Sequence, residues 1–334
     1  MDLIVAGFGT VGQGFAEVIS MRREMLMERF SEEVRIVAAF DSRSYAHSPN
    51  GLDPLELVHR KQATGRVGEN ELKDPLELLR TVDHELLVEV SPTDIESGGR
   101  GLEYIRASLS NGKHVITCNK GPLALRFREL DELAKRNGVA LRFEGSVGGA
   151  MPIVNLASDL LMGEEIHSIQ GILNGTCNFI LSRMDDGLPF HQALTEAQEM
   201  GYAEADPTYD IEGIDSAAKV AILANAIFGI DATFSDVRRV GITGVTEEAI
   251  ALAAEEGQVI RLIGEVSKDR LEVSPRLVPK GHPLSIRGTL NMALLKTDLA
   301  GPITVSGRGA GRLETASALL SDLITVLRDN AKSK

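Results

Sequence analysis

Two charged residues, Asp215 and Lys219, lie four positions apart in the otherwise apolar stretch 213–228. The stretch predicts a buried helix, and the spacing places both side chains on one of its faces. On an exposed helix the pair would be a routine surface salt bridge. Burial of a lysine and a carboxylate is costly unless they are paired and used, so we interpret them as part of a lined pocket. A lysine in such a pocket can act as a general acid or base.

Further polar side chains suited to a substrate site lie before this helix and after a predicted strand. The segment 202–210 concentrates acids and tyrosines, including Tyr202, Glu204 and Asp210; a solvated acidic loop is the alternative interpretation. Lys120 follows a buried strand predicted over 115–117, at the end where α/β sheets place their ligands. Taken alone, a lysine before Gly-Pro is more often a surface charge.

Near the N-terminus, Gly7, Gly9 and Gly12 form the pattern G-x-G-x-x-G between an apolar run at 3–6 and a long predicted helix at 11–30. This context is typical of a dinucleotide-binding turn. Gly7 would permit the tight turn, Gly9 would let backbone N–H groups approach the pyrophosphate, and Gly12 would let the helix pack closely on the strand. A glycine turn without a ligand is the alternative.

The choice between NAD and NADP depends on two residues after the second predicted strand, 34–40. Asp41 could accept hydrogen bonds from an adenosine ribose and disfavour a 2'-phosphate, which indicates NAD. Arg43 could pair with that phosphate, which indicates NADP. The two signals conflict, and both cofactors stay open.

The elements that must position these residues alternate between strand and helix over the first part of the chain. Strand-like runs recur at 86–90, 115–117 and 139–143, with helical stretches at 102–110 and 125–137. This alternation predicts an α/β fold with a Rossmann-type doubly wound parallel sheet. From Met151 the pattern changes, first to a helix ending at Leu161. Strand-like runs then follow at 166–173, 237–243, 259–266, 271–277 and 290–296, which predict a second, α+β domain.

The domain boundaries follow from this change of pattern. We place a nucleotide-binding domain at 1–146 together with 305–334, and a second domain at 147–304. A closing unit of strand 303–305, the glycine-rich segment 307–311 and helix 314–328 is expected to return to the first domain.

Composition excludes several classes of partner. A chain of 334 residues with a formal net charge of −13 and no basic stripe is not expected to bind nucleic acid. The apolar runs are too short for a membrane span, and the N-terminus leaves no room for a signal peptide. Two cysteines fit free thiols in a reducing compartment, so we expect a cytoplasmic protein.

Over nearly its full length the sequence resembles homoserine dehydrogenase. The motifs that carry the resemblance are Gly7-Phe8-Gly9-Thr10-Val11-Gly12, Thr117-Cys118-Asn119-Lys120-Gly121-Pro122, Glu144-Gly145-Ser146-Val147-Gly148-Gly149-Ala150-Met151, Leu173-Asn174-Gly175-Thr176-Cys177-Asn178, Asp206-Pro207 followed by Asp210, Asp215 and Lys219, and Gly307-Arg308-Gly309-Ala310-Gly311. The resemblance implies reversible hydride transfer between NAD(P) and the pair L-homoserine and L-aspartate 4-semialdehyde, in threonine and methionine biosynthesis.

The resemblance also implies roles for individual residues. Lys219 is favoured as the acid or base and Lys120 as its electrostatic partner, with Asp215 holding the lysines, although the order of the two lysines stays open. The residues implied to bind the substrate are Gly175, Thr176, Tyr202, Glu204 and Asp210. Those implied to contact the cofactor are Gly7, Phe8, Gly9, Thr10, Val11, Gly12, Asp41, Arg43, Ser91, Lys120 and Gly309. A monovalent cation, Na+ or K+, is implied at the Glu144 side chain and the carbonyls of Val147, Gly149 and Met151; a glycine hinge without an ion is the alternative.

Members of the family are usually homodimers through the second domain, and the segment 237–296 could supply that surface. The chain matches the short form without a C-terminal regulatory domain. One rival is aspartate-semialdehyde dehydrogenase, which needs a nucleophilic cysteine and a histidine partner; Cys177 and His282 are the candidates, but a small buried thiol fits Cys177 better. A second rival is a catalytically idle nucleotide sensor, against which the presence of both lysines argues.

Overall fold

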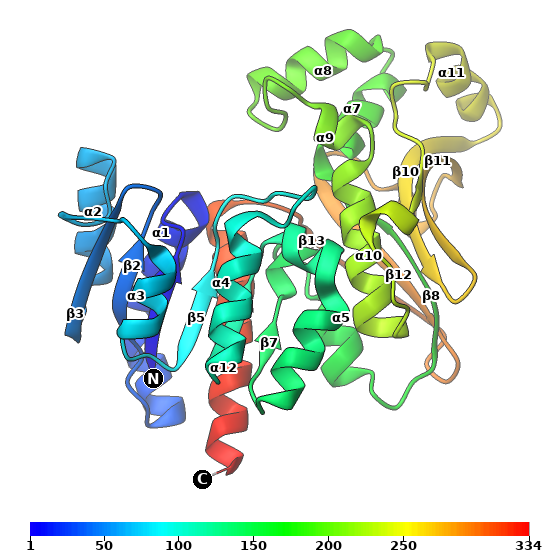
Figure 1. The fold of residues 1–334 in the computed structure, drawn as a ribbon. Helices are drawn as coiled ribbons and strands as arrows, with labels where there is room; N and C mark the ends of the chain where they lie inside the picture. The colour runs from blue at the N-terminus through cyan, green and yellow to red at the C-terminus, as the bar shows by residue number, and fades with distance from the viewer. Residues whose placement is uncertain (334) are drawn as a thin grey trace. The chain divides into compact units, whose positions relative to one another are not determined.

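The computed structural model describes residues 1–333 and divides the chain into two compact units (Figure 1). The first unit contains Met1–Ser146 and the chain from Gly311 onward, and the second contains Val147–Ala310. Residues 305–310, which we assigned from the sequence to the nucleotide-binding domain, instead lie in the second unit. They continue strand β13 (Pro302–Arg308), which pairs with β12 (Leu290–Thr297) of that unit. Only the closing helix belongs to the first unit.

A seven-stranded sheet of order β4-β3-β2-β1-β5-β6-β7 forms the first unit. Five strands run parallel to one another, as predicted: β1 (Asp2–Ala6), β2 (Arg35–Phe40), β5 (Leu86–Glu89), β6 (His114–Thr117) and β7 (Leu141–Arg142). The sequence did not predict the antiparallel edge strands β3 (Ser44–Leu52) and β4 (Asn70–Glu71). Most β3 residues after Ser44 are at least partly exposed, so they lack the apolar run that marks a buried parallel strand.

Six helices accompany this sheet: α1 (Thr10–Phe30), α2 (Pro54–Thr64), α3 (Pro75–Thr81), α4 (Gly99–Ser110), α5 (Lys120–Arg136) and α12 (Arg312–Ser333), with a 3-10 turn at Glu144–Ser146. Helices α2 and α3 each begin with an aspartate N-cap followed by proline, Asp53-Pro54 and Asp74-Pro75. Each aspartate accepts hydrogen bonds from first-turn N–H groups, which are otherwise unsatisfied. The sequence alone contained these two start signals, although we did not use them.

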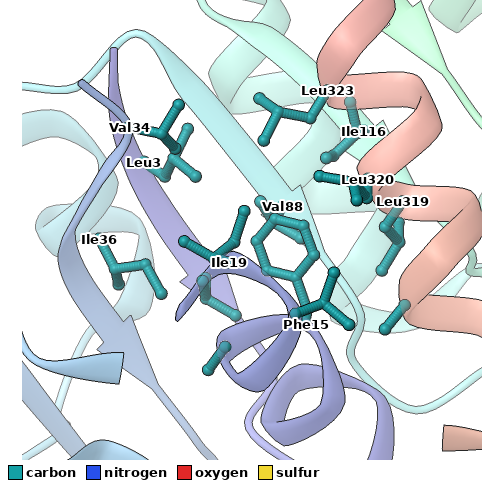
Figure 2. Close-up of a cluster of buried hydrophobic side chains, with 14 of the residues drawn as sticks. Leu3, Phe15, Ile19, Val34, Ile36, Val88, Ile116, Leu319, Leu320 and Leu323 are labelled. Atoms are coloured by element: carbon teal, nitrogen blue, oxygen red, sulfur yellow. The ribbon is translucent and has the colours of Figure 1, made fainter. Parts of the chain in front are cut away.

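The C-terminal helix α12 completes the hydrophobic core of the first unit. Leu319 and Leu323 lie with Phe15 and Ile19 of α1 and Leu3 of β1 in one cluster of buried side chains (Figure 2). All five are nearly inaccessible to solvent. Because α1 follows the glycine turn directly, the last residues of the chain stabilise the element that begins the nucleotide site.

The second unit contains a six-stranded sheet of order β13-β12-β8-β10-β11-β9. Its remaining strands are β8 (Ile166–Ile172), β9 (Arg238–Arg239), β10 (Gln258–Ser267) and β11 (Arg270–Pro279). The strand predicted at 237–243 is reduced to the two residues of β9. Just beyond it Gly241 packs against Ile211, since a Cβ at Gly241 would lie 2.2 Å from the Ile211 carbonyl oxygen.

The helices of this unit are α6 (Ile153–Asn155), α7 (Gly175–Asp185), α8 (Phe190–Glu199), α9 (Thr208–Ile211), α10 (Ile214–Phe228) and α11 (Glu247–Glu255), with short turns at Leu156–Leu160, Phe234–Asp236 and Pro283–Ser285. The helix predicted up to Leu161 is therefore the short α6 followed by a π turn. Helix α10 packs on β10 and β11, and eleven of its fifteen residues are buried. Gly264 of β10 permits this approach, because a Cβ there would lie 3.0 Å from the side chains of Leu173 and Val220.

None of the helices within residues 1–333 combines the length and apolar character that a bilayer span requires.

We predict that Leu323→Ala destabilises the first unit far more than Leu313→Ala in the same helix. Leu323 is fully buried, whereas Leu313 is 48% exposed. A buried Leu→Ala change costs about 2–5 kcal/mol, and an exposed one usually stays within about 0.5 kcal/mol. Urea denaturation followed by circular dichroism measures both values. Equal losses for the two variants would contradict the packing described here.

Candidate active site

Two of the three glycines in the first turn are required by the packing of the chain itself. Gly7 has a φ of +96°, and a Cβ there would lie 2.6 Å from the Val90 carbonyl oxygen. A Cβ at Gly12 would lie 2.2 Å from the Gly7 carbonyl oxygen. Both distances are far shorter than a van der Waals contact, so α1, its turn and the end of β5 approach one another at backbone distance.

Gly9 is different, because a Cβ at this position would meet no atom of the chain within 4 Å. Gly9 is the N-cap of α1 and provides no side-chain cap for the helix. The first N–H groups of α1 therefore suit an anion, and the absent side chain gives a phosphate room to approach them. These features fit the pyrophosphate of a dinucleotide.

The neighbours of the glycines differ in what they can offer a cofactor. Thr10 is exposed and Val11 is half-buried at the first turn of α1. Phe8 is only 1% exposed and belongs to the hydrophobic core. Its side chain is therefore a packing group, and only its backbone could meet a cofactor.

The Asp41 carboxylate is engaged by its own chain. Oδ1 accepts hydrogen bonds from the N–H groups of Arg43 and Ser44 and from the Ser44 hydroxyl, and Oδ2 accepts from Lys61 Nζ at 2.7 Å and Val67 N at 2.9 Å. Burial raises the pKa of Asp41, whereas the hydrogen bonds from Lys61 and the backbone lower it by a larger amount. The pKa of Asp41 therefore lies below its ordinary value. Five donors use the acceptor capacity of a carboxylate, which leaves little for the ribose that the sequence suggested.

The carboxyl ends of β5 and β6 are joined by a buried carboxylate that the sequence analysis did not single out. Glu89 is fully buried and accepts hydrogen bonds from Ser91 N at 2.9 Å, from the Ser91 hydroxyl and from Thr117 Oγ1 at 3.0 Å. The pKa of Glu89 is raised above its ordinary value because burial outweighs the effect of these hydrogen bonds, which lower it. Lys120 begins α5 just beyond Thr117 and is half-buried. An acid at the end of the apolar run 86–90 was the signal that could have identified Glu89.

In the second unit, Lys219 and Asp215 form the predicted pair on α10. Lys219 Nζ lies 2.7 Å from Asp215 Oδ2 and donates a hydrogen bond to the Leu173 carbonyl oxygen at 2.6 Å. The two side chains are only 8% and 12% exposed, respectively. Two of the three N–H groups of the ammonium meet these acceptors, so within the described chain one remains for a substrate oxygen.

Asn174 connects the ion pair to the acidic segment before α10. Its Nδ2 donates to Asp210 Oδ1 at 2.7 Å and to Asp215 Oδ2 at 3.1 Å, while its Oδ1 accepts from Cys177 N and caps α7. The sequence analysis quoted Asn174 in a motif but assigned it no role. An asparagine three residues before the first buried helical position is a recognisable N-cap, although its second function depends on the fold.

The other predicted substrate residues lie around the start of α7. Thr176 Oγ1 donates to the Tyr202 carbonyl oxygen at 2.7 Å, and the Tyr202 ring packs against Phe179. A Cβ at Gly175 would lie 2.5 Å from the Thr289 carbonyl oxygen, so this position also requires glycine. The Glu204 side chain is exposed, and its carbonyl oxygen accepts from Gln198 Nε2. The structure thus places Gly175 and Thr176 directly after Asn174 and brings Tyr202 against Thr176, and it leaves the Glu204 side chain exposed.

Cys177 lacks the surroundings of a nucleophile. The thiol is completely buried and lies 3.1 Å from the Asp210 carbonyl oxygen, to which it donates. Burial raises the pKa of this thiol well above its ordinary value, and the nearby Asp210 and Asp215 carboxylates raise it further. His282 instead accepts a hydrogen bond from Leu284 N. The thiol mechanism of the rival dehydrogenase therefore has no basis in these residues.

The residues predicted to hold a cation are divided between the units. Glu144 lies in the first unit, where it is buried and its N–H donates to Asp322 Oδ2 at 2.8 Å. Val147, Gly149 and Met151 lie in the second unit, in which Gly149 has a φ of +59° and packs against Gly309. Ala150 N donates to the Arg308 carbonyl oxygen, so the two chain segments that connect the second unit to the first are hydrogen-bonded to each other. No group of three His, Cys, Asp or Glu side chains within residues 1–333 is arranged to hold a metal ion.

Comparison with known proteins agrees with both halves of this description. Residues 7–144 match the sequence profile described as homoserine dehydrogenase, NAD binding domain, and residues 152–324 match that of homoserine dehydrogenase. The homoserine dehydrogenase of Methanocaldococcus jannaschii is 48% identical over 99% of this chain and 100% of its own length. The chain belongs to the homoserine dehydrogenase family.

Two further relatives concern the cofactor. The NAD(+)-dependent homoserine dehydrogenase of Pseudomonas canavaninivorans is 37% identical over 97% of this chain and 95% of its own length. A hyperthermophilic archaeal homoserine dehydrogenase in complex with NADPH superposes with a TM-score of 0.86 at 30% identity, and covers 98% of each chain.

This membership confirms the function inferred from the motifs. The chain is an NAD(P)-dependent oxidoreductase that interconverts L-homoserine and L-aspartate 4-semialdehyde, a reaction of threonine and methionine biosynthesis.

The glycine turn yields a prediction that separates ligand binding from folding. Gly9→Ala should leave the unfolding midpoint unchanged, because its Cβ meets no atom of the chain, yet raise the KM for the nicotinamide cofactor about tenfold or more by obstructing the phosphate. Gly12→Ala should lower stability by about 1–3 kcal/mol as well, because its Cβ collides with the Gly7 carbonyl. Thermal unfolding and steady-state kinetics give both quantities. A Gly9→Ala enzyme with unaltered KM would refute the assignment of this turn.

Proposed function

We propose that Lys219 is the acid and base of the homoserine dehydrogenase reaction, and that Asp215 and the Leu173 carbonyl hold its ammonium in place. The bound nicotinamide supplies or accepts the hydride at C4 of the substrate. In the reducing direction the new alkoxide needs a proton, which Lys219 Nζ would deliver through its remaining N–H. In the oxidising direction the homoserine hydroxyl proton would return to the same nitrogen.

The observation that carries this proposal is the geometry of the buried pair. An ammonium with two acceptors at 2.6 and 2.7 Å is fixed in orientation, so its third N–H has one direction. Such fixed donors are effective at stabilising charge that develops during a reaction. The ammonium held in this way carries the proton that the alkoxide needs.

We further propose that Lys120, at the N-terminus of α5, acts on the same substrate as an electrostatic partner. Its positive charge would stabilise the negative charge that develops on the substrate oxygen. The amino group of homoserine is a cation and needs anionic or carbonyl partners. Asp210 and Glu204 would supply charge, while Gly175, Thr176 and Tyr202 would line the site.

Three substitutions in the second unit test the acid and base role. Lys219→Ala should lower kcat by roughly a hundredfold to ten-thousandfold, the usual contribution of a positioned acid or base. Asp215→Asn should lower it less, because Leu173 still orients the amine. Lys268→Ala is the matched control, since Lys268 also pairs with an acid, Glu165 at 2.9 Å, but on the surface. A kcat for Lys219→Ala equal to that of the Lys268→Ala control would contradict the proposal.

For the cofactor we propose a preference for NADP. The Asp41 carboxylate is already satisfied by five donors, one of them Lys61, so it presents little free negative charge to a 2'-phosphate. The exposed Arg43 guanidinium two residues later offers a fork of donors to that phosphate. The end of β2 therefore suits a phosphate better than a pair of ribose hydroxyls.

Cofactor kinetics of Arg43→Ala test this preference. The kcat/KM for NADP should fall about tenfold to a hundredfold, as expected for a lost charged hydrogen bond, with little change for NAD. Arg60→Ala on α2 is the control, since Arg60 is a nearby exposed arginine paired with Glu69 at 2.8 Å. A parallel fall for both cofactors, or none for NADP, would reverse the preference proposed here.

We propose that Glu144, with the carbonyls of Val147, Gly149 and Met151, can hold Na+ or K+, because oxygen ligands and a buried carboxylate suit a hard monovalent ion. We also propose a cytoplasmic homodimer, which two free cysteines permit. The strand-rich segment 237–296, which contains β10 and β11, is the surface that we propose for pairing.

A further inference from the structure

Glu89 occupies a position at which an acid is costly. It ends β5 between buried apolar neighbours, and its side chain is inaccessible to solvent. A buried carboxylate is retained only where hydrogen bonds compensate for lost hydration. The groups that provide this compensation come from two turns that the proposed mechanism requires.

The first turn follows β5 and contains Ser91. Both the Ser91 N–H and its hydroxyl donate to Glu89 Oε1. The same turn contacts the glycine motif, because a Cβ at Gly7 would lie 2.7 Å from Ser91 N. Glu89 therefore fixes the backbone against which the nucleotide turn packs.

The second turn follows β6 and leads into Lys120. Thr117 Oγ1 donates to Glu89 Oε2 at 3.0 Å and accepts from Asn119 N at 2.9 Å. Asn119 Nδ2 lies 3.5 Å from Glu89 Oε1 and 3.4 Å from the Ser91 carbonyl oxygen, while its Oδ1 caps α5 through Gly121 N. The Glu89 carboxylate thus contacts Asn119, the N-cap of α5, which is the helix that begins at Lys120.

Helix α4 covers this arrangement at close range. A Cβ at Gly101 would lie 2.5 Å from Asn119 Nδ2 and 3.1 Å from Glu89 Oε1, so glycine is required there. Water is thereby kept from the carboxylate, and in such surroundings hydrogen bonds between fixed groups are stronger than in solvent.

We propose that Glu89 is a positioning residue that holds the turns after β5 and β6 in a single arrangement, and so sets Ser91 and Lys120 for the nicotinamide reaction. The inference rests on the proposed function, in which Ser91 contacts the cofactor and Lys120 the substrate. A carboxylate is suited to this role because both of its oxygens accept: Oε1 from Ser91 and Asn119, and Oε2 from Thr117. Glutamine keeps the size but offers one accepting oxygen, so it can satisfy only one of the two turns fully.

The test combines Glu89→Gln with Thr117→Val, which removes two hydrogen bonds on the β6 side, the one to Glu89 Oε2 and the one that Thr117 Oγ1 accepts from Asn119 N. For Glu89→Gln we expect the Kd for NADPH, measured by fluorescence without substrate, to rise about tenfold, and kcat to fall about tenfold to a hundredfold, since small misplacements of reacting groups have effects of this size. For Thr117→Val we expect the fall in kcat with a smaller change in Kd. Glu103→Gln on the exposed face of α4 is the control and should match the wild type.

A purely structural role for Glu89 would lower the unfolding midpoint and leave Kd and kcat per folded molecule within twofold of the control, and that result would overturn the inference. If Glu89→Gln does not fold, Thr117→Val decides, and an unchanged kcat overturns it. Lys120→Ala distinguishes a failure of the proposed role of Lys120 from a failure of the proposed role of Glu89. If that variant keeps full activity, the proposed function fails at Lys120 itself, whatever Glu89 does.

Discussion

The second unit is organised around one interaction, the buried ion pair between Lys219 and Asp215. Removing one partner from such a pair costs about 3–5 kcal/mol, because the other charge is left without compensation. The Leu173 carbonyl accepts a hydrogen bond from the Lys219 ammonium, and the Asn174 amide donates one to the Asp215 carboxylate. Both come from the connection between β8 and α7, so the sheet, the helix that follows it and α10 are tied to the same charges. The same contacts fix the direction of the Lys219 ammonium.

The first unit also contains a buried charge-bearing group, Glu89, at the carboxyl end of β5, together with close backbone packing at the glycine turn. Glycine lets the backbone of the nucleotide turn approach β5, and Glu89 ties the end of β5 to that of β6. Helix α12, from the far end of the chain, packs on α1, the helix that follows the glycine turn. Local turn chemistry and long-range packing therefore converge on the same few backbone groups. Neither would position them alone.

The sequence predicted the parts of this account that depend on local pattern. Gly7, Gly9 and Gly12 between a strand and a helix predicted their turn, and an apolar helix with one lysine and one aspartate predicted the buried pair. The partners brought in by folding could not be predicted in this way. Asn174 meets Asp210 and Asp215 only because α9, which contacts both α7 and α10, brings the starts of these helices together. Asp41 accepts bonds from Lys61 and Val67, which lie twenty or more residues further along the chain, on a helix and a loop. The edge strand β3 was missed because its polar residues carry no core pattern.

Chemical rescue of Lys219→Ala by small primary amines tests the central claim most directly. If Lys219 moves the proton, the logarithm of the rate of homoserine oxidation restored by each amine should rise linearly with the pKa of that amine. The same amines should not restore the activity of Lys120→Ala with that dependence. Rescue that ignores amine basicity, or rescue of Lys120→Ala alone with such a dependence, would contradict the account and assign the proton to the other lysine.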